Sequence, residues 1–357
     1  MWTLKRRREK FEPNGASAAA MRPARAAQRP GDEALGEAEL VAEIDLLTGR
    51  NRQAASRDNE RRLLELRHQL GIRRVGASAD TRHPEPDAAA LPTVASGLPE
   101  ISAPEVTPEL LRAGILRDGC LLVRGLIDRD QALAFAAQID RSFVERETGD
   151  TGSPPANGYY EEFEPEPGSG QPIGREWIRM GGGVLAVDAP MLTFEMMEMF
   201  EQAGLPALVR GYLGEPPLIS AQKTTLRKAD PSVPGAWHQD GAFMGPVRAL
   251  NLWLSLSRCG DEAPGLDIVP RRLDDFVTAG TDEAMLDYQV SQRAAENAAG
   301  DRPILRPIFE PGDALFFDEL CLHKTGSDPA MGKPRYAIES WFFGGSAFPT
   351  EYAPVAV

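Results

Sequence analysis

The strongest constraint on the fold is a succession of short strand-like segments in the second half of the chain. Turn residues such as Pro311-Gly312-Asp313 separate these segments, and helical periodicity is almost absent there, apart from a predicted helical insertion around 272–298. Short strands at regular spacing favour a sandwich or barrel over a doubly wound sheet. We therefore predict a mainly β domain with flanking helices, a cupin-like double-stranded β-helix or jelly roll. Its predicted strands are 217–228, 235–243, 249–257, 265–269, 304–309, 313–318 and 335–343.

The first third of the chain has a different pattern. Residues 1–34 are rich in Ala, Arg, Pro and Gly without periodicity, which predicts disorder. Apolar residues at helical spacing predict a helical hairpin over 35–73, and its apolar face must pack against the main domain or against a second subunit. Residues 74–106 are rich in Ala and Pro and are predicted to be a linker. The main domain is expected over 107–345, followed by a C-terminal tail over 346–357.

Helix signals mark the start of the main domain. Thr107-Pro108 is an N-cap followed by a proline at the first helical position, and Asp128 is predicted to cap a second helix over 129–146. A buried strand is expected between them, and another helical region over 191–214. Residues 148–174 are rich in Gly, Pro and acidic side chains, which indicates either a disordered loop or a lid over a site.

Composition and charge exclude several classes of protein. No apolar run approaches the roughly 18 residues of a membrane span, and a signal peptide is absent at the start, so a soluble cytoplasmic protein is expected. Three cysteines are too few for a disulfide framework, and each is predicted to be a small buried hydrophobe. They are Cys120, Cys259 and Cys321.

The formal net charge of −14 is unevenly distributed. Residues 1–30 hold eight basic and two acidic side chains, a net charge of +6, so the rest of the chain carries −20. An acidic body repels a polyanion, so we expect a small-molecule partner and no specific nucleic acid. The basic tail is either solvated or in contact with RNA or an anionic membrane. The N-terminal helices are the candidate contact for a homo-oligomer.

His238 and Asp240 are the first candidate metal ligands. They are two residues apart in a predicted strand, so their side chains are expected on the same face. The chain has only four histidines, and His68 and His83 lie in polar N-terminal segments where we expect them to be exposed to solvent. His323 is thus the sole candidate in the C-terminal part for a third protein ligand.

Two imidazoles and one carboxylate on one face of an octahedral ion leave three positions open, which is the arrangement of non-haem iron oxygenases. Structural zinc would require a fourth protein ligand, and Cys321 is the only candidate near His323. A buried polar pair without a metal is the third alternative. The pattern favours iron.

Further residues follow the first histidine in a fixed order. They are His238-Gln239-Asp240, Asn251-Leu252-Trp253, Gly265 through Pro270, Pro311-Gly312-Asp313, and His323 followed by Arg335. In this order and spacing the chain resembles the phytanoyl-CoA dioxygenase (PhyH) family of Fe(II)/2-oxoglutarate oxygenases over roughly residues 107–345. The resemblance implies an oxidoreductase that uses Fe(II), 2-oxoglutarate and O₂ to hydroxylate a C–H bond of a lipid, amino acid or secondary metabolite, with release of succinate and CO₂.

The resemblance also assigns residues to the co-substrate. It implies that Arg335 meets the distal carboxylate of 2-oxoglutarate, for which a guanidinium fork is well suited, and that Thr325 contacts the same carboxylate. Asn251 and Trp253 share a strand face and match positions that line the co-substrate pocket. Gln222 lies on the preceding strand at about the family's distance from the first histidine.

Several of these assignments have alternatives. The spacing from His323 to Arg335 is one residue longer than is usual in the family, which leaves Lys333 as a rival. Arg335 is otherwise an ordinary strand-end arginine paired with Glu339. Asn251 and Trp253 are otherwise a strand-edge polar residue and a core residue.

The substrate and the reaction are less constrained. Halogenating relatives lack the carboxylate ligand, so Asp240 favours hydroxylation. Pro270 is followed by Arg271-Arg272, which offers cations to an anionic substrate or forms a surface pair. Three apolar side chains are predicted either to line a substrate pocket or to pack in the core: Phe243, Met244 and Trp177. The competing function is a jelly-roll metal-binding scaffold without catalysis.

Overall fold

The computed structural model describes residues 35–77, 81–94, 97–150, 158–233, 235–245, 247–281, 284 and 288–357. Within them, Gly36–Val357 form one compact unit. The predicted disordered tail, residues 1–34, lies outside the described residues, as do residues 151–157 of the loop that we predicted to be disordered or a lid.

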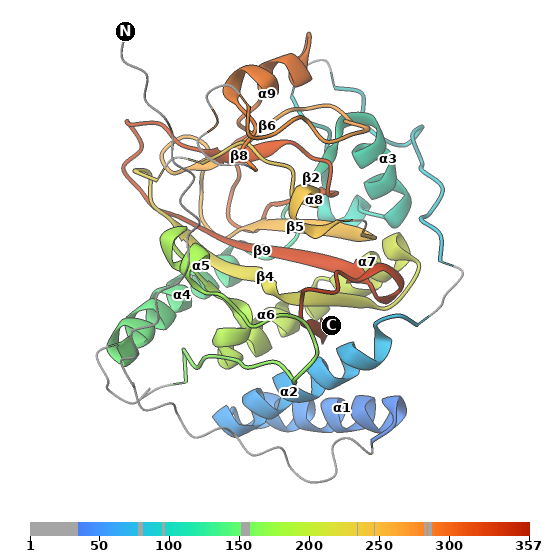
Figure 1. Cartoon of the computed structure of the whole chain (residues 1–357), viewed down its shortest axis with the longest axis vertical. Helices are drawn as coiled ribbons and strands as arrows, with labels where there is room; N and C mark the ends of the chain where they lie inside the picture. Colours follow the sequence, from blue (N-terminus) through green and yellow to red (C-terminus); the bar gives the residue numbers. More distant parts are fainter. Residues whose placement is uncertain are drawn as a thin grey trace, which may run out of the picture. The chain divides into compact units, whose positions relative to one another are not determined.

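A large sheet crosses the middle of the molecule (Figure 1). Its strands follow the order β1-β2-β7-β5-β9-β4-β10, and β3 pairs with β4 outside this path. Neighbours are antiparallel, except that β1 runs parallel to β2. The strands are β1 (Glu100–Ser102), β2 (Cys120–Arg124), β3 (Gly183–Leu185), β4 (Pro217–Ala229), β5 (Ala249–Ser255), β7 (Ala314–Phe317), β9 (Arg335–Gly344) and β10 (Pro354–Ala356).

A smaller sheet lies on one side of the large one. It contains β6 (Gly265–Ile268) and β8 (His323–Gly326), and single bridges extend it, from His238 to His323 and from Leu305 to Ile268. From β4 onward the chain therefore crosses repeatedly between the two sheets. Strands β4, β5, β7 and β9 belong to the large sheet, and the segments between them belong to the small sheet: His238 after β4, β6 and Leu305 after β5, and β8 after β7. This winding is that of a double-stranded β-helix, so the predicted jelly roll is confirmed.

The two faces of the large sheet have different partners. Leu250, Leu252 and Leu254 of β5 are fully buried in a core that also contains residues of the helices on that side. Fully burying one such side chain contributes about 2 kcal/mol, so this face is the apolar one. Because side chains alternate along a strand, Asn251 and Trp253 point the other way, toward the small sheet. The helices that contribute to this core include α3 (Pro108–Asp118), α4 (Arg129–Asp150), α6 (Pro190–Gln202) and α7 (Leu205–Leu213).

The predicted helix starts are confirmed. Thr107 Oγ1 accepts a hydrogen bond from Leu110 N, and Asp128 Oδ1 accepts hydrogen bonds from Asp130 N and Gln131 N. The predicted helical region over 191–214 is two helices, because Gly204, with φ of 67°, interrupts it between α6 and α7.

The N-terminal helices α1 (Glu37–Gln53) and α2 (Arg57–Arg74) pack against each other, and α2 also packs against α6 and β10. The apolar face of the hairpin is therefore covered by its own chain. His68 is buried, not exposed as we predicted, because its Nδ1 meets the carbonyl of Pro354 at 2.6 Å and its Nε2 accepts from Glu166 N. His83 is half-buried, with Nδ1 3.0 Å from the carbonyl of Tyr212.

Two segments that we predicted to be a linker and a tail each contribute a strand. In the linker, Ile101 is buried and β1 pairs with β2. In the C-terminal tail, β10 pairs with β4, while α2 packs so closely on Pro354 that a side chain at Gly71 would collide with its carbonyl oxygen. Pairing with distant strands and packing against a distant helix order both segments, and neither partner is visible in the local pattern.

The predicted helical insertion is mostly not helical in the described residues. Only α9 (Gln292–Ala299) forms there, capped by Ser291, whose Oγ accepts from Ala294 N. Residues 282, 283 and 285–287 of the insertion lie outside the described residues. The remaining short helices are α5 (Glu176–Met180), α8 (Gly241–Met244), η2 (Ala103–Glu105), η3 (Ala186–Asp188) and η4 (Gly345–Ala347).

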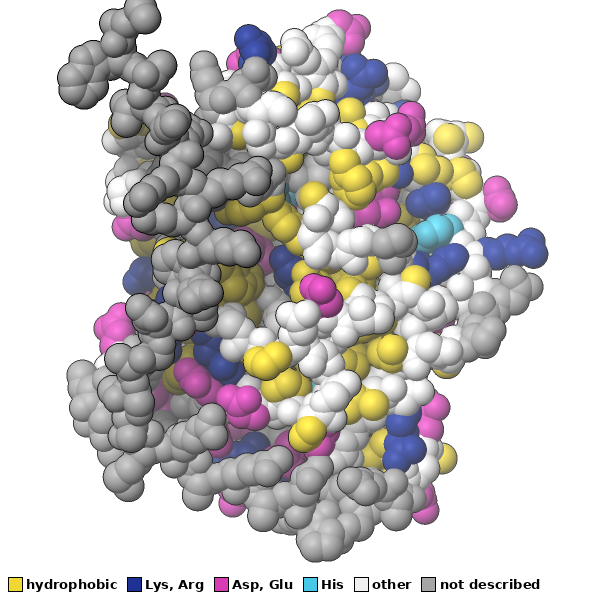
Figure 2. Space-filling model, in the orientation of Figure 1, with side chains coloured by type: hydrophobic (Ala, Val, Ile, Leu, Met, Phe, Trp, Pro, Cys, Tyr) yellow, Lys and Arg dark blue, Asp and Glu magenta, His cyan; other side chains and the backbone are white. Residues whose placement is uncertain are grey.

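The described part of the face in Figure 2 shows no broad area of one charge sign. Figure 2 shows acidic and basic side chains interspersed over the described part of the face in view. A surface of mixed sign does not attract a polyanion over long distances. Among the described residues, no helix has both the length and the apolar character to cross a membrane.

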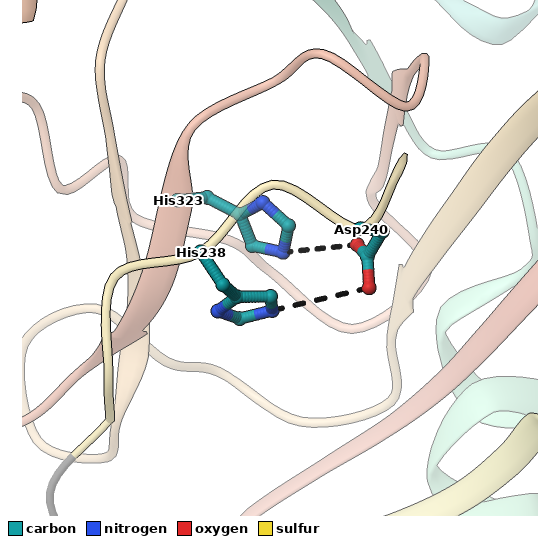
Figure 3. Close-up of side chains that lie close together, drawn as sticks. All are labelled: His238, Asp240 and His323. Atoms are coloured by element: carbon teal, nitrogen blue, oxygen red, sulfur yellow. Dashed lines mark ion pairs between the residues drawn. The ribbon is translucent and has the colours of Figure 1, made fainter. Parts of the chain in front are cut away.

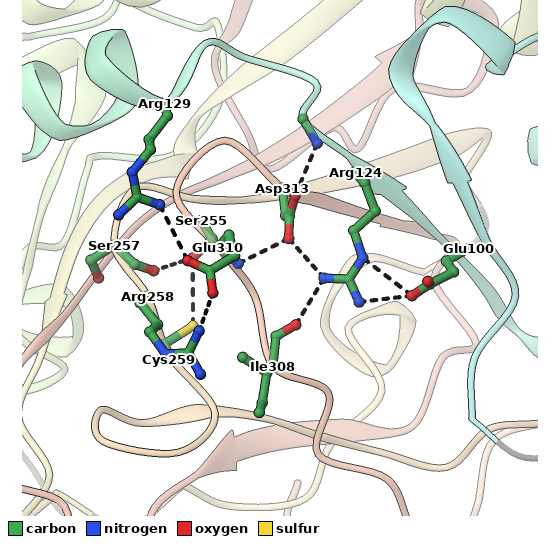
Figure 4. A network of polar contacts seen from close by, with 11 residues as sticks. Glu100, Arg124, Arg129, Ser255, Ser257, Arg258, Cys259, Ile308, Glu310 and Asp313 are labelled. Atoms are coloured by element: carbon green, nitrogen blue, oxygen red, sulfur yellow. Dashed lines mark hydrogen bonds and ion pairs between the residues drawn. The ribbon is translucent and has the colours of Figure 1, made fainter.

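A buried carboxylate fixes the turn that leads into β7 (Figure 4). Asp313 Oδ1 accepts from Gly125 N at 2.9 Å, and its Oδ2 accepts from Arg124 Nη1 at 2.7 Å and from Glu310 N at 2.9 Å. Gly312 has φ of 95°, and a side chain there would collide with the carbonyl of Ile127. The predicted Pro-Gly-Asp turn is thus confirmed, and it joins β2, β5 and β7.

We predict that Asp313→Ala lowers the free energy of unfolding by about 2 to 3 kcal/mol, because it leaves buried donors without an acceptor. Chemical denaturation of the full chain measures this difference. Arg129→Ala is the control: Arg129 belongs to the same network through an exposed ion pair with Glu310, so its loss should leave stability nearly unchanged. Equal effects of the two substitutions would contradict the structural role of Asp313.

Candidate metal centre

A pair of backbone hydrogen bonds places His238 and His323 opposite each other. His238 N donates to His323 O at 3.0 Å, and His323 N donates to His238 O at 3.1 Å. Directly opposite residues of an antiparallel pair project their side chains to the same face. The two imidazole ring centroids therefore lie 4.5 Å apart.

Asp240 reaches the same point by a turn of the chain. The predicted strand 235–243 is wrong after His238: Asp240 has helical dihedrals and is the N-cap of α8. The physical reason is Gln239, whose amide donates to Leu320 O at 2.8 Å and accepts from Val277 N at 2.7 Å, and thereby pulls the backbone out of the sheet. Gly241 N also donates to Glu319 O at 3.0 Å.

The hydrogen bonds of the two imidazoles fix their tautomers. His238 Nδ1 lies 2.7 Å from the carbonyl of Ala236, and His323 Nδ1 lies 3.1 Å from the carbonyl of Cys321. Since a carbonyl only accepts, each Nδ1 carries the proton and each Nε2 keeps a free lone pair. Burial, together with the neighbouring His238, lowers the pKa of His323 to about 4, so this ring is neutral at pH 7.

Both free Nε2 atoms point at the Asp240 carboxylate (Figure 3). His238 Nε2 lies 4.0 Å from Oδ1 and His323 Nε2 lies 3.7 Å from Oδ2. These distances are too long for hydrogen bonds, whereas one ligand atom from each residue lies within 4.8 Å of the other two. Two imidazoles and a carboxylate that converge without bonding each other fit a divalent first-row metal such as Fe(II).

Cys321 does not complete a four-ligand zinc site. Its thiol is buried, and its Sγ is not among the ligand atoms that converge with those of His238, Asp240 and His323. Its contribution is instead the backbone carbonyl that orients His323. Among the described residues, only His238, Asp240 and His323 form a cluster of possible metal ligands.

The interior face of the large sheet next to this cluster contains unsatisfied polar atoms. Asn251 Oδ1, Trp253 Nε1 and Arg335 Nε are buried and have no hydrogen-bond partner among the described residues. Asn251 pairs in register with Phe317, whose ring lies 4.8 Å from His323, and the Arg335 guanidinium lies 5.2 Å from the Trp253 ring. A buried polar atom without a partner costs about 1 to 3 kcal/mol, so three on one face indicate a missing ligand.

Arg335 is a fully buried cation on this face. It begins β9, is 1% exposed, and reaches across to the small sheet, where Nη1 donates to Gly265 O at 3.2 Å. Its Nη2 also meets Glu339 at 3.4 Å, so the alternative ion pair exists. Glu339 is however held more closely by Arg227, at 2.9 Å; burial disfavours its charge, but the two arginines outweigh that and lower its pKa to about 2.

The other predicted co-substrate residues lie in different places. Thr325 is on β8 opposite Leu266, one position from the carbonyl that Arg335 contacts. Gln222 bonds backbone groups with both ends of its amide, donating to Gln171 O and accepting from Ala353 N. Lys333 is 69% exposed and pairs with Glu262, so the buried Arg335 is the better placed of the two cations.

Supporting residues were not predicted. Gln239 anchors the turn, and Gly241 has no room for a side chain because Phe276 and Glu319 lie against it. Trp237 is buried and its Nε1 donates to Gln292 at 2.7 Å, which holds the segment before His238 against α9. The partners of these three residues are distant in the sequence. The only sequence signal for the three residues themselves was that they lie next to His238 and Asp240.

The fold and the site together define a class: a double-stranded β-helix with two imidazoles and one carboxylate converging beside a buried arginine. No protein-family model matches the chain, and no curated protein sequence matches it. Among solved structures, the chain is similar to EctD from S. alaskensis with 2-oxoglutarate and 5-hydroxyectoine, at 16% identity and a TM-score of 0.44, over 76% of this chain and 86% of that one.

Two other solved structures are similar. The epimerase SnoN in complex with Fe³⁺, alpha ketoglutarate and nogalamycin RO is 20% identical, with a TM-score of 0.44 over 66% of this chain and 82% of that one. AviO1 from Streptomyces viridochromogenes Tue57 is 22% identical, with a TM-score of 0.41 over 66% and 94%. At these identities and TM-scores, the fold assignment rests on the strand topology of this chain.

We predict that His323→Ala weakens Fe(II) binding by more than about 100-fold. Loss of a residue that supports a ligand lowers metal affinity by about 10-fold to 100-fold, and loss of the ligand itself should lower it further. Cys321→Ser is the matched control, since it keeps the backbone carbonyl that orients His323, and it should bind iron like the unmodified chain. Anaerobic equilibrium dialysis with metal analysis measures both. A comparable loss in Cys321→Ser would instead favour the four-ligand zinc site.

Proposed function

We propose that this protein is a PhyH-like Fe(II)/2-oxoglutarate-dependent dioxygenase that hydroxylates a C–H bond of a small or medium organic substrate. The observation that carries the proposal is the convergence of two imidazole Nε2 atoms and the Asp240 carboxylate on one point. Three protein ligands on one face of an octahedral ion leave positions for a chelating co-substrate and for O₂.

The residues around the centre have separate roles in this proposal. His238, Asp240 and His323 would hold the iron, and the carbonyls of Ala236 and Cys321 keep both imidazoles in the required tautomer. Iron with 2-oxoglutarate and O₂ supplies the oxidising equivalent: substrate, 2-oxoglutarate and O₂ give hydroxylated substrate, succinate and CO₂.

The co-substrate would lie along the interior face between the metal and Arg335. Within the described part of the chain, Arg335 Nε–H and Trp253 Nε1–H have no hydrogen-bond acceptor, so each can donate to a carboxylate. Asn251 is on the same face, near the metal end. Thr325 lies beside the carbonyl that Arg335 contacts and is the further donor in the proposal. Gln222, with both amide ends occupied by backbone, would position the β4–β10 edge.

Asp240 also favours the reaction type. A carboxylate at this position occupies a coordination site that a halide would need, so hydroxylation is favoured over halogenation. The Phe317 ring against His323 and the Trp341 ring beyond it keep this side of the centre apolar. An apolar surrounding limits access of water to the reacting atoms.

We predict that Asp240→Ala abolishes the conversion of 2-oxoglutarate to succinate in the absence of a prime substrate, because the metal loses its only anionic protein ligand. Quantifying succinate from the iron-loaded full chain measures this activity. Asp267→Asn is the control, since Asp267 pairs with Arg306 and lies opposite Lys324 rather than opposite a metal ligand, and this variant should retain turnover. Unchanged succinate release in Asp240→Ala would refute the proposal, and bound iron without succinate in the unmodified chain would favour the scaffold alternative.

We predict that Arg335→Met raises the KM for 2-oxoglutarate by about tenfold to a hundredfold, the effect of losing a charge-assisted contact with a carboxylate. Steady-state turnover at varied 2-oxoglutarate measures it. Lys333→Met tests the rival cation in parallel and should leave this KM unchanged. If Lys333→Met raised the KM and Arg335→Met did not, the exposed lysine would be the co-substrate ligand.

A further inference from the structure

Lys223 is a cation near the metal centre that the proposed chemistry does not use. It lies on β4, immediately before Thr224, which pairs with Ser340. The adjacent residue of β9 is Trp341, which pairs with Asn251. Lys223 thus belongs to the end of the interior face nearest the metal ligands, and the Asp240 charge acts on it.

Three aromatic rings surround the Lys223 ammonium. Its Nζ lies 5.1 Å from the ring centroid of Phe243, 5.5 Å from that of Trp177 and 5.8 Å from that of Tyr352. These rings come from α8, α5 and the segment before β10, so the fold brings together four distant parts of the sequence. We call Lys223 and these three rings the lysine box. Aromatic faces hold a cation in place by electrostatic attraction and leave its N–H groups able to donate.

The lysine box has no counter-ion among the described residues. No carboxylate there lies within ion-pair distance of Lys223, and no hydrogen bond of its ammonium is found there. Of the charged groups that act on it, Arg227 and Glu339 neutralise each other at 2.9 Å, and Asp240 points at the two imidazoles. Burial lowers the pKa of Lys223, which is the cost of a charge that no partner compensates.

The lysine box is also reachable from solvent. Trp177 is 40% exposed, and Lys223, Phe243 and Tyr352 are each half-buried. The lysine on the same strand that faces the other way behaves differently, because Lys228 pairs with Asp140 at 2.6 Å. An ion-paired surface lysine and an unpaired, ring-enclosed lysine therefore stand five residues apart on β4.

We propose that the lysine box is the recognition site for a carboxylate on the prime substrate, with the rings contacting the apolar part of the substrate next to that carboxylate. This inference rests on the proposed function and names its substrate class: an organic acid whose carboxylate is held by Lys223 while an apolar C–H bond faces the metal. The ammonium donates to the carboxylate, and the carboxylate supplies the missing counter-charge.

The co-substrate is the competing occupant, because 2-oxoglutarate is itself a dicarboxylate. Arg335 pairs in register with Ala229 at the far end of β4, six residues from Lys223, which separates their backbones by about 20 Å. The two cations thus lie at opposite ends of one face. This separation favours an arrangement in which Arg335 binds 2-oxoglutarate and Lys223 binds the carboxylate of the prime substrate.

The test uses a pair of probes with the same shape and different charge, 3-phenylpropanoate and 3-phenylpropanamide. Their binding to the full chain is measured by anaerobic calorimetry, with and without iron(II) and saturating 2-oxoglutarate. The acid should bind at least about tenfold more tightly than the amide, the effect of one charge-assisted hydrogen bond. Lys223→Met should remove this preference and Lys223→Arg should retain it, while Lys228→Met, the matched control on the same strand, should have no effect.

Three outcomes would overturn the inference. The acid and the amide bind the unmodified chain equally, or neither binds; Lys223→Met keeps the preference for the acid; or 2-oxoglutarate displaces the acid, which would assign Lys223 to the co-substrate. Thermal unfolding of each variant shows that it is folded. Because probe binding is also measured without metal, a failure here is distinct from a failure of the iron proposal, which the succinate assay of Asp240→Ala tests separately.

Discussion

The reciprocal backbone hydrogen bonds between His238 and His323 are the interaction on which the site depends. They join the segment after β4 to β8, and so close the small sheet over the large one. The same two bonds bring both imidazoles to one face, where the carbonyls of Ala236 and Cys321 orient them. Fold closure and ligand geometry therefore have a common cause, and a change that separates these strands would disturb both.

The large sheet divides the molecule into a stable side and a reactive side. On one face, leucines and aromatic residues pack against helices, and this burial supplies most of the favourable free energy. On the other face, Asn251, Trp253 and Arg335 have atoms without a hydrogen-bond partner, and Lys223 has no counter-ion, among the residues that the structure describes. These groups reduce stability unless ligands complete them, so the apolar face must compensate for the cost of the polar one.

Much of the fold follows from local pattern, because alternation, capping residues and turn residues act over a few positions. Thr107, Asp128 and the Pro-Gly-Asp turn act in this way, and each has the predicted role. The pattern does not reveal pairing partners. The local pattern predicted a linker where β1 forms, a tail where β10 forms, and a solvent-exposed His68. These predictions failed because the residues that order these segments are more than 20 residues away in the chain.

The candidate ligands were determined by the sequence itself: four histidines, two of them in polar segments, and an aspartate two residues after one of the others. The tertiary structure decided how those ligands meet. Asp240 turns toward the imidazoles because the Gln239 amide hydrogen-bonds to the backbone of Leu320 and Val277. The alternation of residues along a strand does not predict this turn. The tertiary structure also decided the lysine box, since three aromatic rings and one lysine become neighbours only when β4, α5, α8 and the C-terminal segment fold together.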